Sequence, residues 1–464
     1  MRRTGNFGSA SINAGLVGLL ALSGCGGSGG GSTTVIDAAV TTDGGGGTIA
    51  LDMSTDGATG GTTGDAGPTT DALTPDAAGA DQGVPPCPEG SGFGYIAAPT
   101  ALTSGAKANH SPRSVWNGSE FAAVWLSVGE GELGSVKFQR FNINGQPVGS
   151  LQDLGLAKIP RYDVAWNGGG YVVTYLGAKS MEGEGYTGLR VVSLGADGTP
   201  LDVPADLPAT SDADRVAIGF APLSGGMLVY SNGRNGADGI YAQPLDEGGG
   251  KVGAPQHLAS TAANNPAVAF GNGSWGVAWT EPTGTAPNQL VFKLIDDHGV
   301  AVPNGRAPLQ PDSGARGPVY LVYGNQDTFG LAWSHVDEMG GIKPKLTLIS
   351  GTDASVEAQP DVLGPEGYGI VTDLAWHDPD FFGVAWQDNN GAAQKVGITR
   401  VNPVGVAQEP FAIVAPGTGA TGGLSAAGTV SNLGAFYTLD PTPSSAGFSD
   451  AAQVYLSRLG ACHR

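Results

Sequence analysis

The sequence has little positive charge: Lys and Arg number 22 against 42 Asp and Glu, which gives a formal net charge of −20. A surface that binds nucleic acid needs Lys and Arg to neutralise phosphate groups, so we expect no nucleic-acid partner. The 79 Gly and 31 Pro argue against long helices, while 40% hydrophobic residues are enough for a large core. The composition therefore predicts an all-β protein.

The sequence also offers no apolar run near its start that could span a bilayer. The run from Ala14 to Leu22 follows two arginines and is too short, a layout typical of an export signal. It ends in the sequence LSGC at Cys25, which resembles a bacterial lipobox. The resemblance implies that residues 1–24 are a lipoprotein signal peptide and that Cys25 carries a lipid anchor. An ordinary signal peptide cut near the same place is the alternative.

Large side chains are rare in the next segment, and residues 26–86 contain no Lys, Arg or aromatic residue. Gly, Ala, Thr, Ser, Asp and Pro cannot bury enough apolar surface to offset the conformational entropy of folding. We therefore predict that residues 25–86 form a disordered tether, which the spaced aspartates keep extended.

The rest of the chain repeats one short motif seven times: a strand, a tight turn, and a second strand that ends in an aromatic residue. The clearest copy is SVWNGSEFAAVW at 114–125. The second aromatic stands at Trp125, Tyr175, Tyr230, Trp279, Trp333, Trp386 and Tyr437. A repeat of about fifty residues is typical of propeller blades. The repeat predicts a seven-bladed β-propeller of four-stranded antiparallel blades over residues 87–464.

Side-chain alternation in the second strands indicates how the blades pack. In Phe329-Gly330-Leu331-Ala332-Trp333 the large residues fall on one face and the small residues on the other. We expect the bulky face of one blade to lie on the Gly/Ala face of the next, with the aromatic residues in the core.

The seventh repeat ends without a fourth strand, and residues Gly94 to Leu102 precede the first repeat in the place of a fourth strand. We therefore expect the N-terminal segment to complete the last blade. With Cys25 lipidated, only Cys87 and Cys462 remain, one at each end of the propeller. In an exported protein this count predicts a disulfide between them; two free thiols are the alternative.

No catalytic motif survives its context. Residues 129–134 fit GxGxxG but join two strands and open no helix, and the histidines lack the spacing of a zinc site. Residues 388–391 match part of a calcium loop without its bidentate glutamate, so we expect no cofactor, calcium being the alternative. The long loops predict a binding face, with these candidate residues: Glu130, Glu132, Arg161, Arg215, Glu281, Arg316, Asp337, Glu338 and Asp388. Dispersed, solvated charges are the alternative for this set.

As a whole, the chain resembles the mostly uncharacterised Gly-rich bacterial lipoproteins that carry a WNGxxYxVxW-like propeller repeat behind a low-complexity tether. The resemblance implies a propeller fold and an anchor to the cell envelope through Cys25. We expect the protein to be a monomer. Gly26 stands where aspartate can signal inner-membrane retention, which implies the outer membrane. We predict a binding module for protein or glycan. The alternative is a polysaccharide-directed hydrolase or lyase that uses carboxylates of the long-loop face.

Overall fold

The computed structural model describes residues 93–461 apart from residues 131, 179–185, 208–209, 211–212, 222–223, 234–238, 260–261, 283–287, 325, 338–339, 361, 363–368, 378–380, 389–394, 414–419, 430–431 and 443–447. The chain divides into two compact units, Met1–Pro75 and Asp76–Arg464, and every described residue lies in the second. The described residues include no helix with the length and hydropathy of a membrane span.

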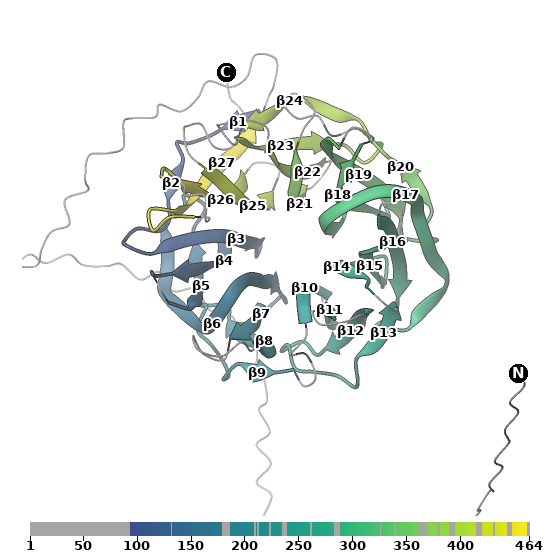
Figure 1. Ribbon diagram of the computed structural model, residues 1–464, viewed down its shortest axis with the longest axis horizontal. Coiled ribbons are helices and arrows are strands. Elements are labelled where there is room, and N and C mark those ends of the chain that lie inside the picture. Colours follow the sequence, from purple (N-terminus) through teal and green to yellow (C-terminus); the bar gives the residue numbers. More distant parts are fainter. Residues whose placement is uncertain are drawn as a thin grey trace, which may run out of the picture. The chain divides into compact units, whose positions relative to one another are not determined.

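All regular elements of the described residues are β-strands, which pair antiparallel in five sheets around a central opening (Figure 1). The first seven-stranded sheet consists of β3 (Ala108–Trp116), β4 (Phe121–Val128), β5 (Gly134–Phe141), β6 (Pro147–Trp166), β7 (Gly170–Ala178), β8 (Tyr186–Gly195) and β9 (Ala205–Asp206). The second consists of β14 (Asn264–Gly271), β15 (Ser274–Glu281), β16 (Asn288–Ile295), β17 (Ala301–Tyr323), β18 (Thr328–Val336), β19 (Ile342–Ser350) and β20 (Val356–Ala358). The all-β prediction is confirmed.

The remaining strands form smaller sheets. One four-stranded sheet consists of β10 (Ala213–Ala221), β11 (Gly225–Asn232), β12 (Gly239–Leu245) and β13 (Gln256–Ala259). Another consists of β21 (Ile370–His377), β22 (Phe381–Asp388), β23 (Lys395–Val401) and β24 (Ala407–Ile413). The last sheet contains β25 (Ala420–Thr429), β26 (Asn432–Asp440) and β27 (Gln453–Ala461), together with β1 (Phe93–Tyr95) and β2 (Thr100–Ala101).

Each seven-stranded sheet contains one long strand that pairs with different neighbours through its two halves. β6 pairs with β5 as far as Ala157 and with β7 from Ala157 onward. β17 likewise pairs with β16 as far as Ala315 and with β18 from there. Both long strands therefore join two four-stranded groups without a break in the strand.

The innermost strands surround the central opening (Figure 1). They are β3, β6, β10, β14, β17, β21 and β25, each of which contacts the next, and β25 contacts β3. Side chains on these strands therefore converge from all around the opening, although they are far apart in the sequence.

The tight turns between first and second strands are fixed by asparagine. Asn117 Oδ1 accepts hydrogen bonds from the backbone N–H groups of Ser119 at 2.8 Å and Glu120 at 2.7 Å, while Gly118 adopts a φ of +101°. Only glycine takes this conformation without strain, which explains the Asn-Gly pair. Asn117 Nδ2 also donates to Tyr171 Oη at 2.8 Å and so links β3 to the group that follows.

The core confirms the predicted packing of large residues on small ones. The second aromatic residue of every repeat is buried, and the most exposed of them, Tyr230, is only 5% exposed. A Cβ atom at Gly330 would lie 2.6 Å from the ring of Phe382, and one at Gly434 would lie 2.7 Å from Phe121. No side chain fits at these glycines, because the neighbouring ring already fills the space.

The N-terminal strands join the last sheet, as expected from the sequence. Phe93 to Tyr95 pair antiparallel with Leu459 to Ala461, and Thr100 and Ala101 pair with Leu456 and Tyr455. Thr103 Oγ1 adds a hydrogen bond to Gln453 Oε1 at 2.7 Å. The first and last described strands of the chain therefore share one sheet.

Candidate functional site

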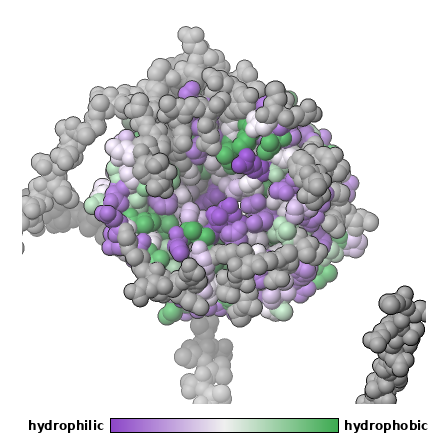
Figure 2. Space-filling view, in the orientation of Figure 1, coloured by the Kyte–Doolittle hydropathy of each residue, from purple (hydrophilic) through white to green (hydrophobic). Residues whose placement is uncertain are grey.

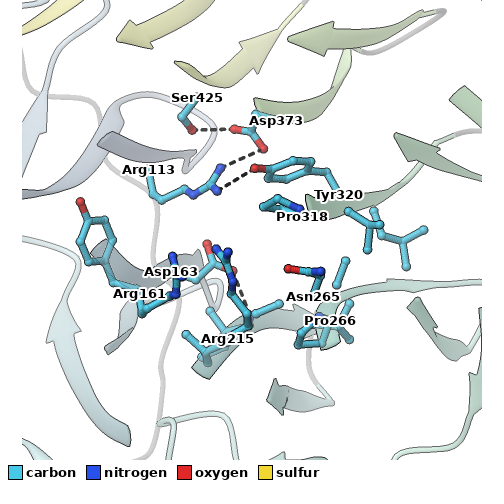
Figure 3. A pocket seen from close by; sticks show the side chains of 18 of the residues that line it. Arg113, Arg161, Asp163, Arg215, Asn265, Pro266, Pro318, Tyr320, Asp373 and Ser425 are labelled. Carbon is cyan, nitrogen blue, oxygen red and sulfur yellow. Dashed lines mark hydrogen bonds and ion pairs between the residues drawn. The ribbon is translucent and has the colours of Figure 1, made fainter. Parts of the chain in front are cut away.

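A cavity of about 180 Å³ lies where the innermost strands converge (Figure 3). Polar and charged side chains line much of it, among them Arg113, Arg161, Asp163, Arg215, Asn265, Tyr320, Asp373 and Ser425. Figure 2 shows hydrophilic residues gathered at the centre of this face of the molecule. The cavity is therefore a polar site within an otherwise apolar, closely packed fold.

The strand register places one residue from each innermost strand at an equivalent position. Each pairs with the residue that precedes the second aromatic of its repeat: Arg113 with Val124, Asp163 with Thr174, Ala217 with Val229, Ala267 with Ala278, Tyr320 with Ala332, Asp373 with Ala385 and Ser425 with Phe436. The first residue of each pair, on the innermost strand, lines the cavity. We call this set the inner column.

Every innermost strand has a break in its register shortly before the inner column. The column residue is the first to pair after the break on β3, β14, β17, β21 and β25, the second on β6 and the third on β10. Four of the breaks include residues with positive φ, namely Ser111 at 58°, Asn265 at 56°, Gly317 at 75° and Gly423 at 58°. Such bulges add residues to one strand, leave part of its backbone outside the ladder and redirect side chains. The bulges therefore change the direction of the strands just before the residues that line the cavity.

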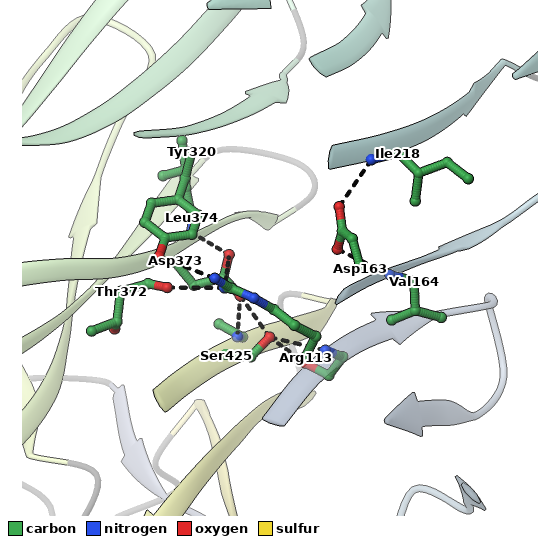
Figure 4. Close-up of polar contacts among 11 residues, drawn as sticks. Arg113, Asp163, Val164, Ile218, Tyr320, Thr372, Asp373, Leu374 and Ser425 are labelled. Carbon is green, nitrogen blue, oxygen red and sulfur yellow. Dashed lines mark hydrogen bonds and ion pairs between the residues drawn. The ribbon is translucent and has the colours of Figure 1, made fainter. Parts of the chain in front are cut away.

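Two aspartates of the inner column accept hydrogen bonds from backbone N–H groups of the innermost strands (Figure 4). Asp163 accepts hydrogen bonds from its neighbour Val164 N at 2.9 Å and from Ile218 N, on β10, at 3.0 Å. Asp373 repeats the pattern with Leu374 N at 2.9 Å and Ala426 N, on β25, at 3.0 Å. Each aspartate therefore connects its strand to the next innermost strand.

Ser425 continues the same pattern with a hydroxyl group. Its Oγ donates to Asp373 Oδ2 at 2.6 Å and accepts from Ser114 N, on β3, at 3.0 Å. The side chain is fully buried. A buried hydroxyl with both roles satisfied stabilises the fold and leaves little capacity for a ligand.

Arg113 binds groups from two other innermost strands, β17 and β21. Its Nη1 donates to Thr372 O at 3.0 Å and lies 3.7 Å from Asp373 Oδ1, and its Nη2 donates to Tyr320 Oη at 3.1 Å. Burial alone lowers the pKa of Arg113, but Tyr320, Asp373 and Asp163 together raise it above its usual range. The guanidinium thus stays charged and offsets part of the negative charge of the two half-buried aspartates.

Both of those aspartates nevertheless hold protons more tightly than usual. Burial raises the pKa of Asp163 to about 6, against the opposing effects of Arg113 and the two backbone N–H groups. Burial also raises the pKa of Asp373, again opposed by Arg113. A carboxyl group with a pKa of about 6 can exchange a proton near neutral pH. Asp163 is therefore a titratable group of the cavity.

Arg161 and Arg215 lie on the other side of the cavity from Asp373 and Ser425 (Figure 3). Arg161 Nε lies 3.7 Å from Asp214 Oδ1. Arg215 Nε is buried and has no hydrogen-bond partner among the described residues. Burial and the nearby charge of Arg161 together lower the pKa of Arg215 to about 10, against the opposing effects of Asp214 and Tyr320. The surroundings of Arg215 therefore disfavour its charged form.

Of the residues predicted from the sequence, the structure brings only Arg161 and Arg215 to this cavity. Glu132 pairs with Lys107, Glu281 accepts from Trp279 Nε1 and Gln289 Nε2, and Asp337 pairs with Lys343. Glu130 and Arg316 are exposed, and Asp388 is buried at the end of β22. Within the described residues these six lie outside the cavity lining.

The remaining predicted residues lie outside the described part of the chain: Glu338 of the binding face, Cys25 of the lipobox, and Cys87 and Cys462 of the expected disulfide.

The sequence reasoning did not select Asp163, Tyr320, Asp373 or Ser425 as site residues. A signal for them exists, because each stands three residues before the end of its first-strand motif, as Arg113 stands before Trp116. Aligning that column across the repeats gives Arg, Asp, Ala, Ala, Tyr, Asp and Ser. Such variable polar residues at one repeat position are unusual for a core strand and mark the site.

In the described ranges, no group of three or more His, Cys, Asp or Glu side chains is placed to hold a metal ion. The expected calcium alternative rested on residues 388–391, of which only Asp388 is described.

No known family matches the sequence, and no curated protein does. Among solved structures, the phage phi92 endosialidase resembles it with a TM-score of 0.49 and 10% identity, over 80% of this chain and 70% of that one. The polysaccharide lyase Uly1 gives 0.48 and 10% over 81% and 94% of the two chains. An ulvan lyase of a polysaccharide lyase family gives 0.49 and 12% over 78% and 95%. These similarities assign no residue and no reaction to this chain.

Proposed function

We propose that the protein is a seven-bladed β-propeller that binds a glycan in its central cavity while a lipid at Cys25 anchors it to the cell envelope. Dividing β6 and β17 at the residues where their pairing changes supports the blade count, because six groups then have four strands, and in the seventh β1 and β2 both pair with β27 beside β26 and β25. The pairing of Phe93 with Ala461 supports a Cys87 to Cys462 disulfide, since Cys462 adjoins that pair in the sequence.

The observation that carries the proposed binding function is the polar lining of the cavity. Arg161, Arg215, Asn265 and Tyr320 present donors and acceptors to one enclosed space. A volume of about 180 Å³ exceeds what one water requires, roughly 10–15 Å³, and falls below the roughly 300 Å³ at which drug-sized pockets begin. This size suits one sugar residue at the end of a longer chain. A protein partner would require a much larger, flatter contact area.

Binding of the purified full chain to an array of neutral and acidic glycans tests this proposal. The test variant is Tyr320→Ala, which removes an aromatic surface and a hydroxyl group from the cavity while leaving the outer surface unchanged. The wild type is the reference. We expect the wild type to bind at least one class of glycan and the variant to bind it at least ten-fold more weakly. Equal binding by both proteins would place the glycan site elsewhere.

One observation favours the polysaccharide hydrolase or lyase alternative. Asp163 has a pKa of about 6 and shares the cavity with Asp373, and a carboxyl group with a raised pKa is what general acid catalysis requires. Against it, both aspartates already accept backbone N–H groups of neighbouring strands. Incubation with the bound glycan decides between the functions: release of shorter chains that Asp163→Asn abolishes would make the protein an enzyme.

A further inference from the structure

The charge of the cavity is opposite to that of the chain. The formal net charge is −20, yet three guanidinium groups and only two carboxylates are found among the described residues that line the cavity. Arg113 is committed to Asp373, Tyr320 and Thr372. The excess positive charge therefore lies with Arg161 and Arg215 on the other side.

Arg161 and Arg215 repel each other, because like charges in a partly buried site are poorly screened. Asp214 offsets this only in part, at 3.7 Å from Arg161 Nε. Such an arrangement is unfavourable for folding unless an anion binds between the two groups. The same arrangement is favourable for binding, since a bound anion relieves both the repulsion and the desolvation.

The inner column shows where an anion would find further donors. Asp163 accepts from Ile218 N, and Asp373 and Ser425 accept from Ala426 N and Ser114 N, each the residue after the column position on the next strand. Val268 and Leu321 occupy the corresponding positions, each one residue after the column residue of the strand that follows Ala217 and Ala267. Alanine side chains supply no acceptor, and the N–H groups of Val268 and Leu321 belong to residues that line the cavity.

We propose that Arg215, with Arg161 beside it, binds the carboxylate of a uronic acid, which takes the place that Asp163 and Asp373 fill in other repeats. The geometry suits a monoanion, because Asp214 already pairs with Arg161, which leaves the single charge of Arg215, and the two carboxylates of the lining would repel a dianion. The guanidinium fork matches a carboxylate with two parallel hydrogen bonds. Asn265 and Tyr320 then lie within the same cavity to bind sugar hydroxyl groups.

This inference rests on the proposed glycan-binding function and narrows it to acidic glycans. The test titrates the full chain with oligogalacturonate, with the neutral galactose oligomer of the same length, and with acetate. We expect oligogalacturonate to bind well and the other two weakly. If neutral and acidic oligomers bind equally, the carboxylate site is refuted while glycan binding stands. If no oligomer binds, the carboxylate site is refuted, and the glycan array alone decides whether glycan binding stands.

Arg215→Met keeps the apolar stem and removes the charge, and Arg316→Met is the matched control on an exposed arginine outside the cavity. Loss of a charge-assisted pair should weaken oligogalacturonate binding about 10- to 100-fold in Arg215→Met, with no change in Arg316→Met. The thermal midpoint of Arg215→Met should equal or exceed that of the wild type. Unchanged affinity, or a clearly lower midpoint, would show that Arg215 serves the fold instead.

A second variant tests the acceptor positions independently. Ala217→Asp supplies the carboxylate that Asp163 and Asp373 supply elsewhere in the inner column. We expect this side chain to occupy the anion site, so that Ala217→Asp folds but loses oligogalacturonate binding. Ala217→Asn, similar in shape and uncharged, should retain more of the binding. Wild-type affinity in Ala217→Asp would contradict the assignment.

Discussion

The two sides of the central cavity both contain buried or half-buried arginine, and they differ in how many hydrogen-bond acceptors surround it. On the braced side, formed by Tyr320, Asp373, Ser425, Arg113 and Asp163, hydrogen bonds link consecutive innermost strands. The open side is formed by Arg161, Arg215, Ala217, Asn265 and Ala267, where alanine replaces the acceptors.

The difference shows that arginine burial alone does not define a role. Arg113 and Arg215 both line the cavity, yet the pKa of Arg113 is raised by its partners and that of Arg215 is lowered by burial and by Arg161. A cation whose neighbours stabilise its charge serves the fold. A cation whose charge its surroundings disfavour is the one available to a ligand.

The largest effect should come from Arg113→Met on the braced side. The substitution leaves Asp373 and Asp163 in a buried site without their common counter-charge, and removal of one partner from such a pair is strongly destabilising. We expect a loss of about 3 kcal/mol in the free energy of unfolding, measured by denaturant titration at pH 7. A loss below about 1 kcal/mol would remove the distinction between the two arginines.

Asp163→Asn should change the pH dependence of stability. The folded protein holds the Asp163 proton with a pKa of about 6, whereas the ordinary value of about 3.9 applies to the unfolded chain. The contribution of this group is therefore complete below about pH 4 and is lost as pH rises through about 6. Asp373 acts in the same direction, because its pKa is also raised.

The measurement compares unfolding free energies of the wild type and Asp163→Asn between pH 4 and pH 7. We expect the difference between the two proteins to shift by about 2 kcal/mol across this range, in favour of the variant at the higher pH. Parallel pH profiles would mean that Asp163 titrates normally.

On the open side, Arg215→Met should have the opposite sign. The charge of Arg215 is disfavoured by burial, so its removal should raise the free energy of unfolding by about 1 kcal/mol after allowance for partial exposure. Thermal and denaturant unfolding without ligand measure this effect, with Arg316→Met expected to stay within about 0.5 kcal/mol of the wild type.

Ser425→Ala should give the smallest effect on the braced side. Asp373 and Ser114 N each lose one hydrogen bond, while Asp373 keeps those from Leu374 N and Ala426 N. We expect a loss of about 1 kcal/mol in unfolding free energy, with ligand binding unchanged. A ten-fold loss of oligogalacturonate binding would instead assign Ser425 to the site.

Much of the fold follows from local sequence. The aromatic that ends each second strand, the Asn117-Gly118 turn and the alternation around Gly330 predict buried strands, tight hairpins and large-on-small packing. The expected pairing of the N-terminal segment with the last strand is confirmed by Phe93 to Tyr95. These features repeat, so each copy supports the others.

The site was harder to predict, because its contacts join distant parts of the chain. Arg113 meets Tyr320 and Thr372 across 207 and 259 residues, and no local pattern records such a meeting. The prediction favoured loop carboxylates, but Glu281 and Asp337 bind residues close by in the sequence. Repetition reveals the strands, whereas the site depends on where the copies differ.

The placement of β1 and β2 in the last sheet sets an order for folding. Thr103 and Gln453 are separated by 350 residues, so the first strands have no partner until nearly the whole chain is available. Contacts of such long range form slowly, because a large loop must close before they stabilise anything. The earlier repeats can fold in succession during synthesis. Pairing of β1 and β2 with β27 is then the final step, and it joins the first and last described strands in one sheet.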